Sequence, residues 1–212
     1  MYGGLGTDIA IFSGDKNNYS ITQTGYAQYQ IVDNKGTDGS DTLKNVEKLR
    51  FSDQTIAVKQ IFSNRSELDT AVDAWIDDQD AATETYGDIN TWDVSAITDF
   101  SELFKDKTSF NSDIGNWDVS NGKRFDYMFY GASSFNQDIS SWDVTNIERL
   151  GLGAMFYGAS SFNQDISSWD VSKNKDFTFM FRGASSFNQD ISSWDVSSCL
   201  LYTSDAADDA NC

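Results

Sequence analysis

The amino-acid sequence predicts an α/β repeat solenoid of short parallel strands and short helices, preceded by a small β-rich segment. Two observations in the second half of the chain carry this prediction. First, five tryptophans that each precede Asp-Val recur at steps of 25, 25, 27 and 25 residues: Trp92, Trp117, Trp142, Trp169 and Trp194. Second, an aromatic cluster, a lone Phe and the sequence Asn-x-Asp-Ile recur with the same period. Self-similarity at about 20–50 residues is typical of chains whose units bury their apolar faces against one another.

The composition excludes several classes of function. Thirty-three acidic and fifteen basic residues give a net charge of −18, which argues against contacts with nucleic-acid or membrane phosphates. We find no apolar run long enough for a membrane span and no secretory signal at the start of the sequence. The chain has no histidine, the commonest general base and metal ligand. We therefore expect that this protein is not an enzyme.

Residues 1–60 are expected to form the β-rich segment. Apolar residues alternate there around two turns, which is the pattern of antiparallel hairpins. The pairs are Tyr19/Ile21 with Tyr29/Ile31, and Leu49/Phe51 with Ile56/Val58. Residues 61–91 are expected to form a linker and a helix that covers the first repeat, because Leu68, Ala71, Val72, Trp75 and Ile76 fall at helical spacing after a possible N-cap at Ser66. The alternative for this helix is a surface that binds a partner.

Residues 92–198 are expected to hold about four repeat units, which begin at Trp92, Trp117, Trp142 and Trp169. Within a unit, Phe125, Met128 and Phe129 at positions i, i+3 and i+4 predict a helix of about two turns. Trp142 and Val144 predict a short strand that points both side chains inward. Glycines follow the aromatic clusters where a left-handed residue is expected: Gly131, Gly158 and Gly183. The third unit carries two extra residues around 150–153, which we expect to form a bulge on the helical side.

Aspartates recur in two columns. Asp93, Asp118, Asp143, Asp170 and Asp195 follow the tryptophans, and Asp88, Asp113, Asp138, Asp165 and Asp190 recur with the same period. Stacked carboxylates repel one another, so something must offset the repulsion. One interpretation is that each Asp accepts hydrogen bonds from nearby Ser hydroxyls and turn amides. The other is that the columns collect Ca²⁺, with the first column as the candidate interaction and cation face. The column Asn111, Asn136, Asn163 and Asn188 predicts a ladder of side-chain amides.

Two stretches resemble known families. Residues 3–11, GGLGTDIAI, fit the nonapeptide of the RTX, haemolysin-type calcium-binding family. That resemblance implies half of a Ca²⁺ site, with Asp8 as ligand and Gly3, Gly4 and Gly6 shaping the loop; the alternative is a glycine-rich turn. Units such as WDVSNGKRFDYMFYGASSFNQDIS resemble the BspA-like repeats of bacterial surface proteins over about residues 64–198. That resemblance implies a leucine-rich-repeat-like fold and a role in adhesion and protein contacts.

The last residues, 199–212, resemble the read-through translation of a transposase adapter used in sequencing libraries. We expect them to be a non-native tail, the alternative being an unusual cap, and we expect the natural protein to continue. Both cysteines, Cys199 and Cys212, lie in this tail.

These features together predict a non-catalytic adhesion or protein-interaction module of a secreted or cell-surface bacterial protein, with a protein, cell-surface or matrix ligand. The alternative is a calcium-stiffened spacer of an RTX exoprotein whose active domain lies elsewhere.

Overall fold

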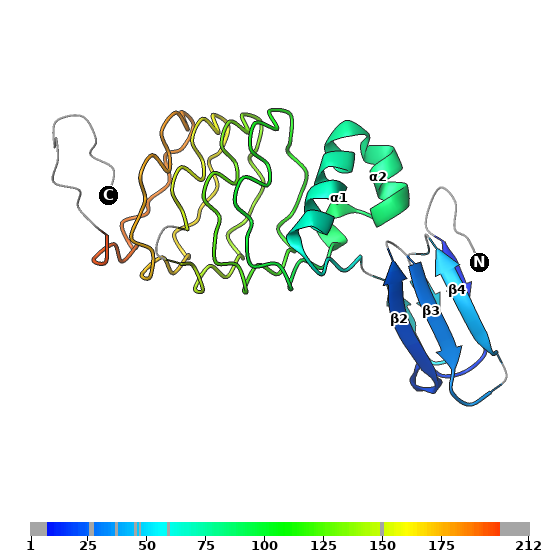
Figure 1. Cartoon of the computed structure of the whole chain (residues 1–212). Coiled ribbons are helices and arrows are strands. Elements are labelled where there is room, and N and C mark those ends of the chain that lie inside the picture. Colours follow the sequence, from blue (N-terminus) through cyan, green and yellow to red (C-terminus); the bar gives the residue numbers. More distant parts are fainter. Residues whose placement is uncertain are drawn as a thin grey trace, which may run out of the picture.

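The computed structural model describes residues 8–25, 28–36, 38–44, 46, 48–58, 60–148 and 151–199. Strands lie at the N-terminal end, two helices follow, and irregular coils continue from there toward the C-terminal end (Figure 1). The described hydrophobic residues divide into two cores. One lies within residues 10–51, and the other extends from Phe62 to Met180 and includes the helices.

Two three-stranded sheets form the N-terminal part. The first has the order β1-β5-β6 and comprises Ile9–Ile11, Lys48–Arg50 and Thr55–Ala57, with β1 and β5 parallel. The second has the order β2-β3-β4 and comprises Tyr19–Gly25, Gln28–Asp33 and Ser40–Lys44, all antiparallel. The two predicted hairpins are confirmed, since Ile21 pairs with Ile31 and Leu49 pairs with Ile56. A short 3₁₀ turn, Lys16–Asn18, precedes β2.

The helix α1, Arg65–Asp77, begins earlier than the sequence indicated. Its N-cap is Asn64, whose Oδ1 accepts a hydrogen bond from the Glu67 amide at 3.1 Å, so the predicted cap at Ser66 is wrong. The Glu67 carboxylate in turn accepts a bond from the Ser63 amide at 2.8 Å. Leu68, Ala71, Val72 and Trp75 are buried, as their spacing predicted. Asn64 is the N-cap rather than Ser66 because the Asn64 and Glu67 side chains together satisfy two backbone amides at the start of the helix.

The second helix, α2 (Gln79–Tyr86), was not predicted. Asp78 ends α1 and also caps α2, where its Oδ1 accepts a hydrogen bond from the Ala81 amide at 3.1 Å. Gly87 ends α2 with a φ of 74°, a left-handed conformation that glycine adopts without strain. A 3₁₀ turn, Ile89–Thr91, then leads into the first repeat. Trp75 of α1 packs on Trp92 with ring centroids 5.8 Å apart, which joins the helices to the repeat core.

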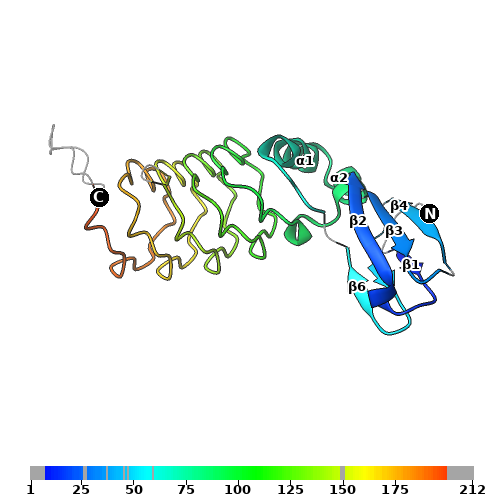
Figure 2. The same cartoon turned by 60° about the horizontal axis from the view of Figure 1, so that its bottom comes forward.

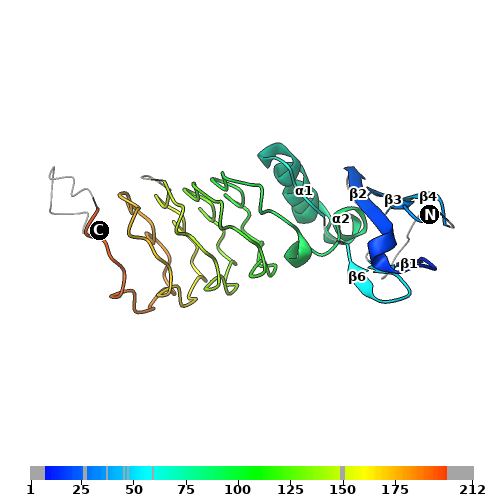
Figure 3. The ribbon, with the colours of Figure 1, turned by 90° about the horizontal axis from the view of Figure 1, so that it is seen from below.

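The predicted α/β repeat solenoid is wrong. Among the described residues of 92–199 there is no helix and no strand, only turns joined by irregular backbone and isolated β-bridges. The regular secondary structure of the described chain is instead mostly β, in two sheets at the N-terminal end, with the two helices of residues 65–86. Each repeat forms an irregular coil, and consecutive coils lie side by side (Figures 2 and 3).

A left-handed residue prevents the predicted repeat helices. Tyr127, between Phe125 and Met128, has a φ of 60°, and the equivalent residues of the other units are also left-handed: Glu102, Ala154 and Phe179. A right-handed helix cannot pass through such a residue. The amides of Phe125 and Tyr127 instead donate to Gly151 and Gly153 of the next unit, at 2.8 and 3.0 Å. This conformation could not be predicted from the sequence, because Tyr, Glu, Ala and Phe do not favour a positive φ.

Aromatic rings stack from unit to unit inside these coils. Phe129 is fully buried and stacks on Phe104 and Phe156, with centroids 5.5 and 5.6 Å away. Trp142 stacks on Trp169 at 6.5 Å with an interplanar angle of 3°. The indole N–H groups of four tryptophans each donate to the carbonyl of an Ile 28 or 30 residues earlier: Trp117 to Ile89, Trp142 to Ile114, Trp169 to Ile139 and Trp194 to Ile166. The predicted inward position of Trp142 and Val144 is confirmed, whereas the strand that would have produced it is absent.

Ile61, which lies in the sequence between the two cores and belongs to neither, is hydrogen-bonded to the β2 sheet. The Gln23 side chain of β2 accepts a hydrogen bond from the Ile61 amide and donates one to the Ile61 carbonyl, both at 3.2 Å. Ile61 also forms a parallel bridge with Asp93 of the first unit. The Gln23 side chain thus connects the β2 sheet to the segment that enters the helices and repeats.

Candidate functional site

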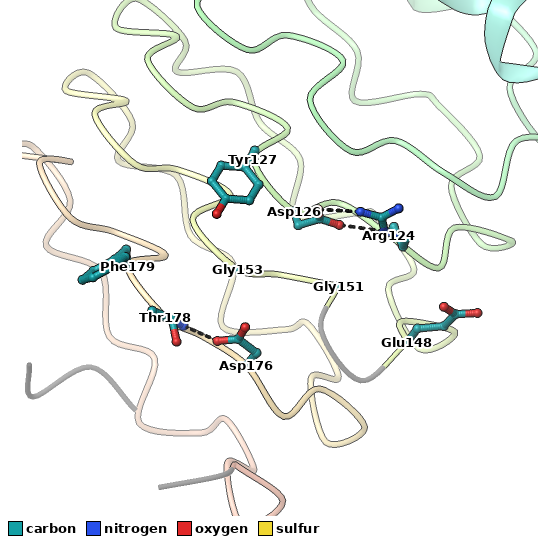
Figure 4. A pocket seen from close by; sticks show the side chains of 9 residues that line it. All are labelled: Arg124, Asp126, Tyr127, Glu148, Gly151, Gly153, Asp176, Thr178 and Phe179. Atoms are coloured by element: carbon teal, nitrogen blue, oxygen red, sulfur yellow. Dashed lines mark hydrogen bonds and ion pairs between the residues drawn. The ribbon is translucent and has the colours of Figure 1, made fainter. Parts of the chain in front are cut away.

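An open groove interrupts one side of the repeats at the third unit (Figure 4). Its volume is about 600 Å³. The described residues that line it come from three consecutive units: Arg124, Asp126, Tyr127, Glu148, Gly151, Gly153, Asp176, Thr178 and Phe179. The predicted site residues lie elsewhere, since none of the first-column aspartates is among the described residues that line this groove.

The groove exists because the third unit lacks large side chains at three register positions. Arg124, Asp126 and Tyr127 of unit two are followed 27 residues later by small residues: Gly151, Gly153 and Ala154. Twenty-five residues further, unit four has Asp176, Thr178 and Phe179 at the same positions. The hydrogen bonds between units keep these positions in register. A row of side chains is therefore missing between two rows that are present.

The two glycines of the groove floor are constrained differently. A Cβ on Gly151 would lie 2.6 Å from the Lys123 carbonyl oxygen and 2.7 Å from Cγ2 of Ile147, so this position excludes every side chain. A Cβ on Gly153 would lie 3.5 Å from Oδ2 of Asp176, an ordinary van der Waals distance. The backbone therefore requires glycine at 151 but leaves Gly153 free to carry a side chain that would fill the groove.

Aromatic side chains stand beside the groove, outside the core. We call Tyr127, Tyr130, Tyr157 and Phe179 the aromatic strip. Tyr130 stacks on Tyr157 at 4.7 Å, Tyr127 lies 5.9 Å from Tyr130, and Phe179 meets Tyr157 edge-on at 6.4 Å. Tyr127 is 40% exposed, whereas the core ring of Phe129 is fully buried. The strip thus presents ring surface that the repeat core does not use.

Two cations at the groove, Arg124 and Lys123, already have partners. Arg124 donates to both carboxylate oxygens of Asp126, at 3.0 and 2.8 Å, and to Asp99 at 3.3 Å. The hydrogen bonds to Asp126 raise the pKa of this guanidinium. Lys123 lies 3.4 Å from Glu148. These contacts neutralise Arg124 and Glu148 internally.

Asp176 is the exception among the groove carboxylates. Its Oδ1 accepts a hydrogen bond from the Thr178 amide at 2.8 Å (Figure 4). Its Oδ2 is the closest atom to the space above Gly153. No Lys or Arg of the described residues forms an ion pair with it. The groove therefore contains one carboxylate oxygen that forms no ion pair with a Lys or Arg within residues 60–148 and 151–199.

The predicted interaction face forms local turns. Each first-column aspartate accepts a hydrogen bond from the amide of the residue two positions later, at 3.0 or 3.1 Å: Asp93, Asp118, Asp143, Asp170 and Asp195. Each second-column aspartate does the same at 2.9 Å: Asp88, Asp113, Asp138, Asp165 and Asp190. Such bonds stabilise the turns and offset repulsion between neighbouring carboxylates. The asparagine column forms a ladder in which side chain alternates with backbone: Oδ1 of Asn111 accepts a hydrogen bond from the backbone amide of Asn136 at 2.9 Å.

Calcium binding stays a prediction. Gly3, Gly4 and Gly6 lie outside the described residues, and the carbonyl of Asp8 accepts a hydrogen bond from the Lys48 amide at 3.1 Å. In the part of the chain that the structure describes, no group of three or more His, Cys, Asp or Glu side chains could hold a metal ion. Thermal melts with calcium and with a chelator test the prediction, and an unchanged midpoint would exclude it.

We expect acid to destabilise the repeats. Hydrogen bonds from the Thr145 hydroxyl and amide lower the pKa of Asp143, and the Ser140 amide lowers the pKa of Asp138. The pKa values of four further column aspartates are lowered in the same way: Asp165, Asp170, Asp190 and Asp195. These carboxyls bind protons more readily in the unfolded chain than in the folded one. Their contribution to the free energy of unfolding is therefore fully present above their ordinary pKa of 3.8 and is lost as pH falls below it.

Thermal melts between pH 6 and pH 2.5 would measure this loss as a falling midpoint. A midpoint that rises on acidification would contradict this prediction. It would show that protonation relieves more repulsion among the carboxylates, which give the chain its net charge of −18, than it costs in lost hydrogen bonds.

Sequence reasoning missed the groove. The signal was present in the two extra residues of unit three and in the glycines around 151–153, but these were interpreted as a bulge. The groove is visible only once the register places small residues between Tyr127 and Phe179, because no single unit contains it.

A family model described as "Mycoplasma protein of unknown function, DUF285" matches residues 78–151 and 150–204. No curated protein and no solved structure matches the chain. The assignment to BspA-like leucine-rich repeats and to the RTX family is therefore wrong, because the matching model is that of a different family. The alternative of a spacer in an RTX exoprotein depended on the RTX assignment and is therefore not pursued further. Among the described residues, no helix combines the length and apolar character needed to cross a membrane.

Proposed function

We propose that this chain, which belongs to the family of Mycoplasma proteins of unknown function DUF285, is a non-catalytic protein-interaction module. Its groove and aromatic strip would hold a segment of a partner protein at the bacterial surface or outside the cell. One observation carries the proposal: ring surface of the strip stands outside the core beside an open groove, with Tyr127 at 40% exposure. Aromatic and Arg side chains are enriched in protein interfaces and among the residues that dominate binding energy.

The chemistry of the groove supports binding rather than catalysis. The chain has no histidine, and the Arg124 and Glu148 side chains are engaged with Asp126 and Lys123. General acid–base catalysis needs a group positioned and tuned to move a proton, and engaged ion pairs serve this poorly. The net charge of −18 favours a protein partner over nucleic acid. The 198 residues before Cys199 contain no cysteine, which is compatible with an exported protein.

A displayed library of random 12-residue peptides, selected on the full chain, tests this function. We expect selected peptides to bind wild-type protein and to lose affinity at least tenfold on Tyr127→Ala, about 1.4 kcal/mol, because this residue offers the most exposed ring of the strip. Fluorescence anisotropy of labelled peptides measures the affinities.

Val196→Ala is the matched control, since Val196 is also 40% exposed but does not line the groove. Selected peptides should bind this variant as they bind wild type. Failure to select any peptide, or equal weakening by both substitutions, would contradict the proposed function.

A further inference from the structure

We infer that the groove accepts an arginine side chain from the partner segment. This inference rests on the proposed function, because it names the chemistry of the group that the groove would hold. Three features of the groove support it: a carboxylate on the floor without an ion-pair partner among the described residues, aromatic rings on both sides, and a vacant register position between them.

The carboxylate is that of Asp176. Its Oδ1 is occupied by the Thr178 amide at 2.8 Å, while its Oδ2 borders the space above Gly153. No described Lys or Arg neutralises it, in contrast to Asp126 and Glu148. A carboxylate oxygen in a groove walled by protein binds a donor cation more strongly than one in open water, because the local dielectric is lower. The floor therefore selects a positively charged group.

The walls fit a cation as well. Tyr127 and Phe179 line the groove from units two and four, and Ala154 occupies the register position between them. On this same surface, Lys105 lies 5.7 Å from the Tyr127 ring centroid, and Arg182 lies 5.0 Å from that of Phe179. Neither cation is among the described residues that line the groove. The surface thus already pairs cations with these rings, and Lys105 and Arg182 do so outside the part of the groove that the structure describes.

Arginine matches this combination better than lysine. A planar guanidinium can stack on aromatic rings and still present several N–H donors to a carboxylate, whereas an ammonium is a compact, strongly hydrated charge. The chain's net charge of −18 adds a long-range attraction for a basic partner. Arginine is also the commoner cation in contacts with aromatic rings.

The test uses three short peptides on the full chain: N-acetyl-Gly-Arg-Gly-amide, the same peptide with citrulline, and the same peptide with lysine. Citrulline keeps the shape of arginine without its charge. Binding is followed by NMR chemical-shift titration at low ionic strength. We expect saturable binding of the arginine peptide, with shifts confined to the groove. The citrulline peptide should bind at least tenfold more weakly, and the lysine peptide several-fold more weakly.

Two variants locate the interaction. Asp176→Asn keeps the Oδ1 acceptor for the Thr178 amide, so the turn should persist while affinity for the arginine peptide falls about tenfold. Asp170→Asn is the matched control, because Asp170 accepts the Ser172 amide in the same way but does not line the groove. Gly153→Thr, which copies the Thr178 of the next unit, should also abolish binding by filling the floor.

Equal binding of the citrulline peptide, equal or tighter binding of the lysine peptide, or no effect of Asp176→Asn would each overturn the assignment. The peptide library separates this failure from that of the proposed function. If selected peptides depend on Tyr127 but contain no enriched arginine, the interaction function stands and the arginine site falls. If no peptide of any composition is selected, the proposed function itself fails.

Discussion

Replacing Trp142 by alanine is expected to lower the free energy of unfolding by about 3–5 kcal/mol, because a buried indole is lost from the middle of the repeat core. Trp142 is 3% exposed, and its ring lies 6.2–6.5 Å from the ring centroids of Phe125, Phe129 and Trp169. Its indole N–H also donates to the Ile114 carbonyl at 3.2 Å, so the substitution leaves this acceptor without a partner. Denaturant unfolding followed by circular dichroism measures the change.

Trp194→Ala provides the comparison within the same column. Trp194 makes the equivalent hydrogen bond to Ile166 at 3.1 Å but is only partly buried. We expect this variant to lose about half as much stability, because less apolar surface returns to water. Equal losses for the two tryptophans, or a loss below about 1 kcal/mol for Trp142, would show that the indole column does not hold the units together.

The inward pattern of the repeats could be predicted from the sequence, but their backbone could not. The period of the tryptophans and of Phe110, Phe135 and Phe162 identified the buried columns, because burial follows hydrophobic spacing whatever the backbone does. Spacing of i, i+3 and i+4 is shared by a helix and by a chain of single turns. The left-handed residue at Tyr127 decides between them, and its side chain gives no sign of that conformation.

Site prediction failed for a related reason. The interaction face was predicted at the aspartates because they repeat regularly. Each of them instead accepts a hydrogen bond within its own turn, as Asp138 and Asp143 do. The groove arises from what one unit lacks, at Gly151, Gly153 and Ala154, relative to its neighbours. A pattern-based search emphasises what recurs, whereas a binding site in a repetitive chain is expected where the repetition is broken. An alignment of the units would have located these small residues. It would not have shown the register that places them between the large side chains of units two and four.

Gly122→Ala is expected to destabilise the chain by about 2–3 kcal/mol, because the added methyl group would overlap atoms that cannot move away. Its Cβ would lie 2.3 Å from Cζ of Phe125 and 2.8 Å from the Val119 carbonyl oxygen. The Phe125 ring is fully buried and stacks on Phe100 at 5.3 Å, so it has no free space to enter. Gly153→Ala is the control, since its Cβ meets nothing closer than 3.5 Å, and we expect a change within about 0.5 kcal/mol. Denaturant unfolding of both variants measures the difference; equal stabilities would mean that the turn at Gly122 relaxes and that the packing of Phe125 does not fix the backbone of its unit.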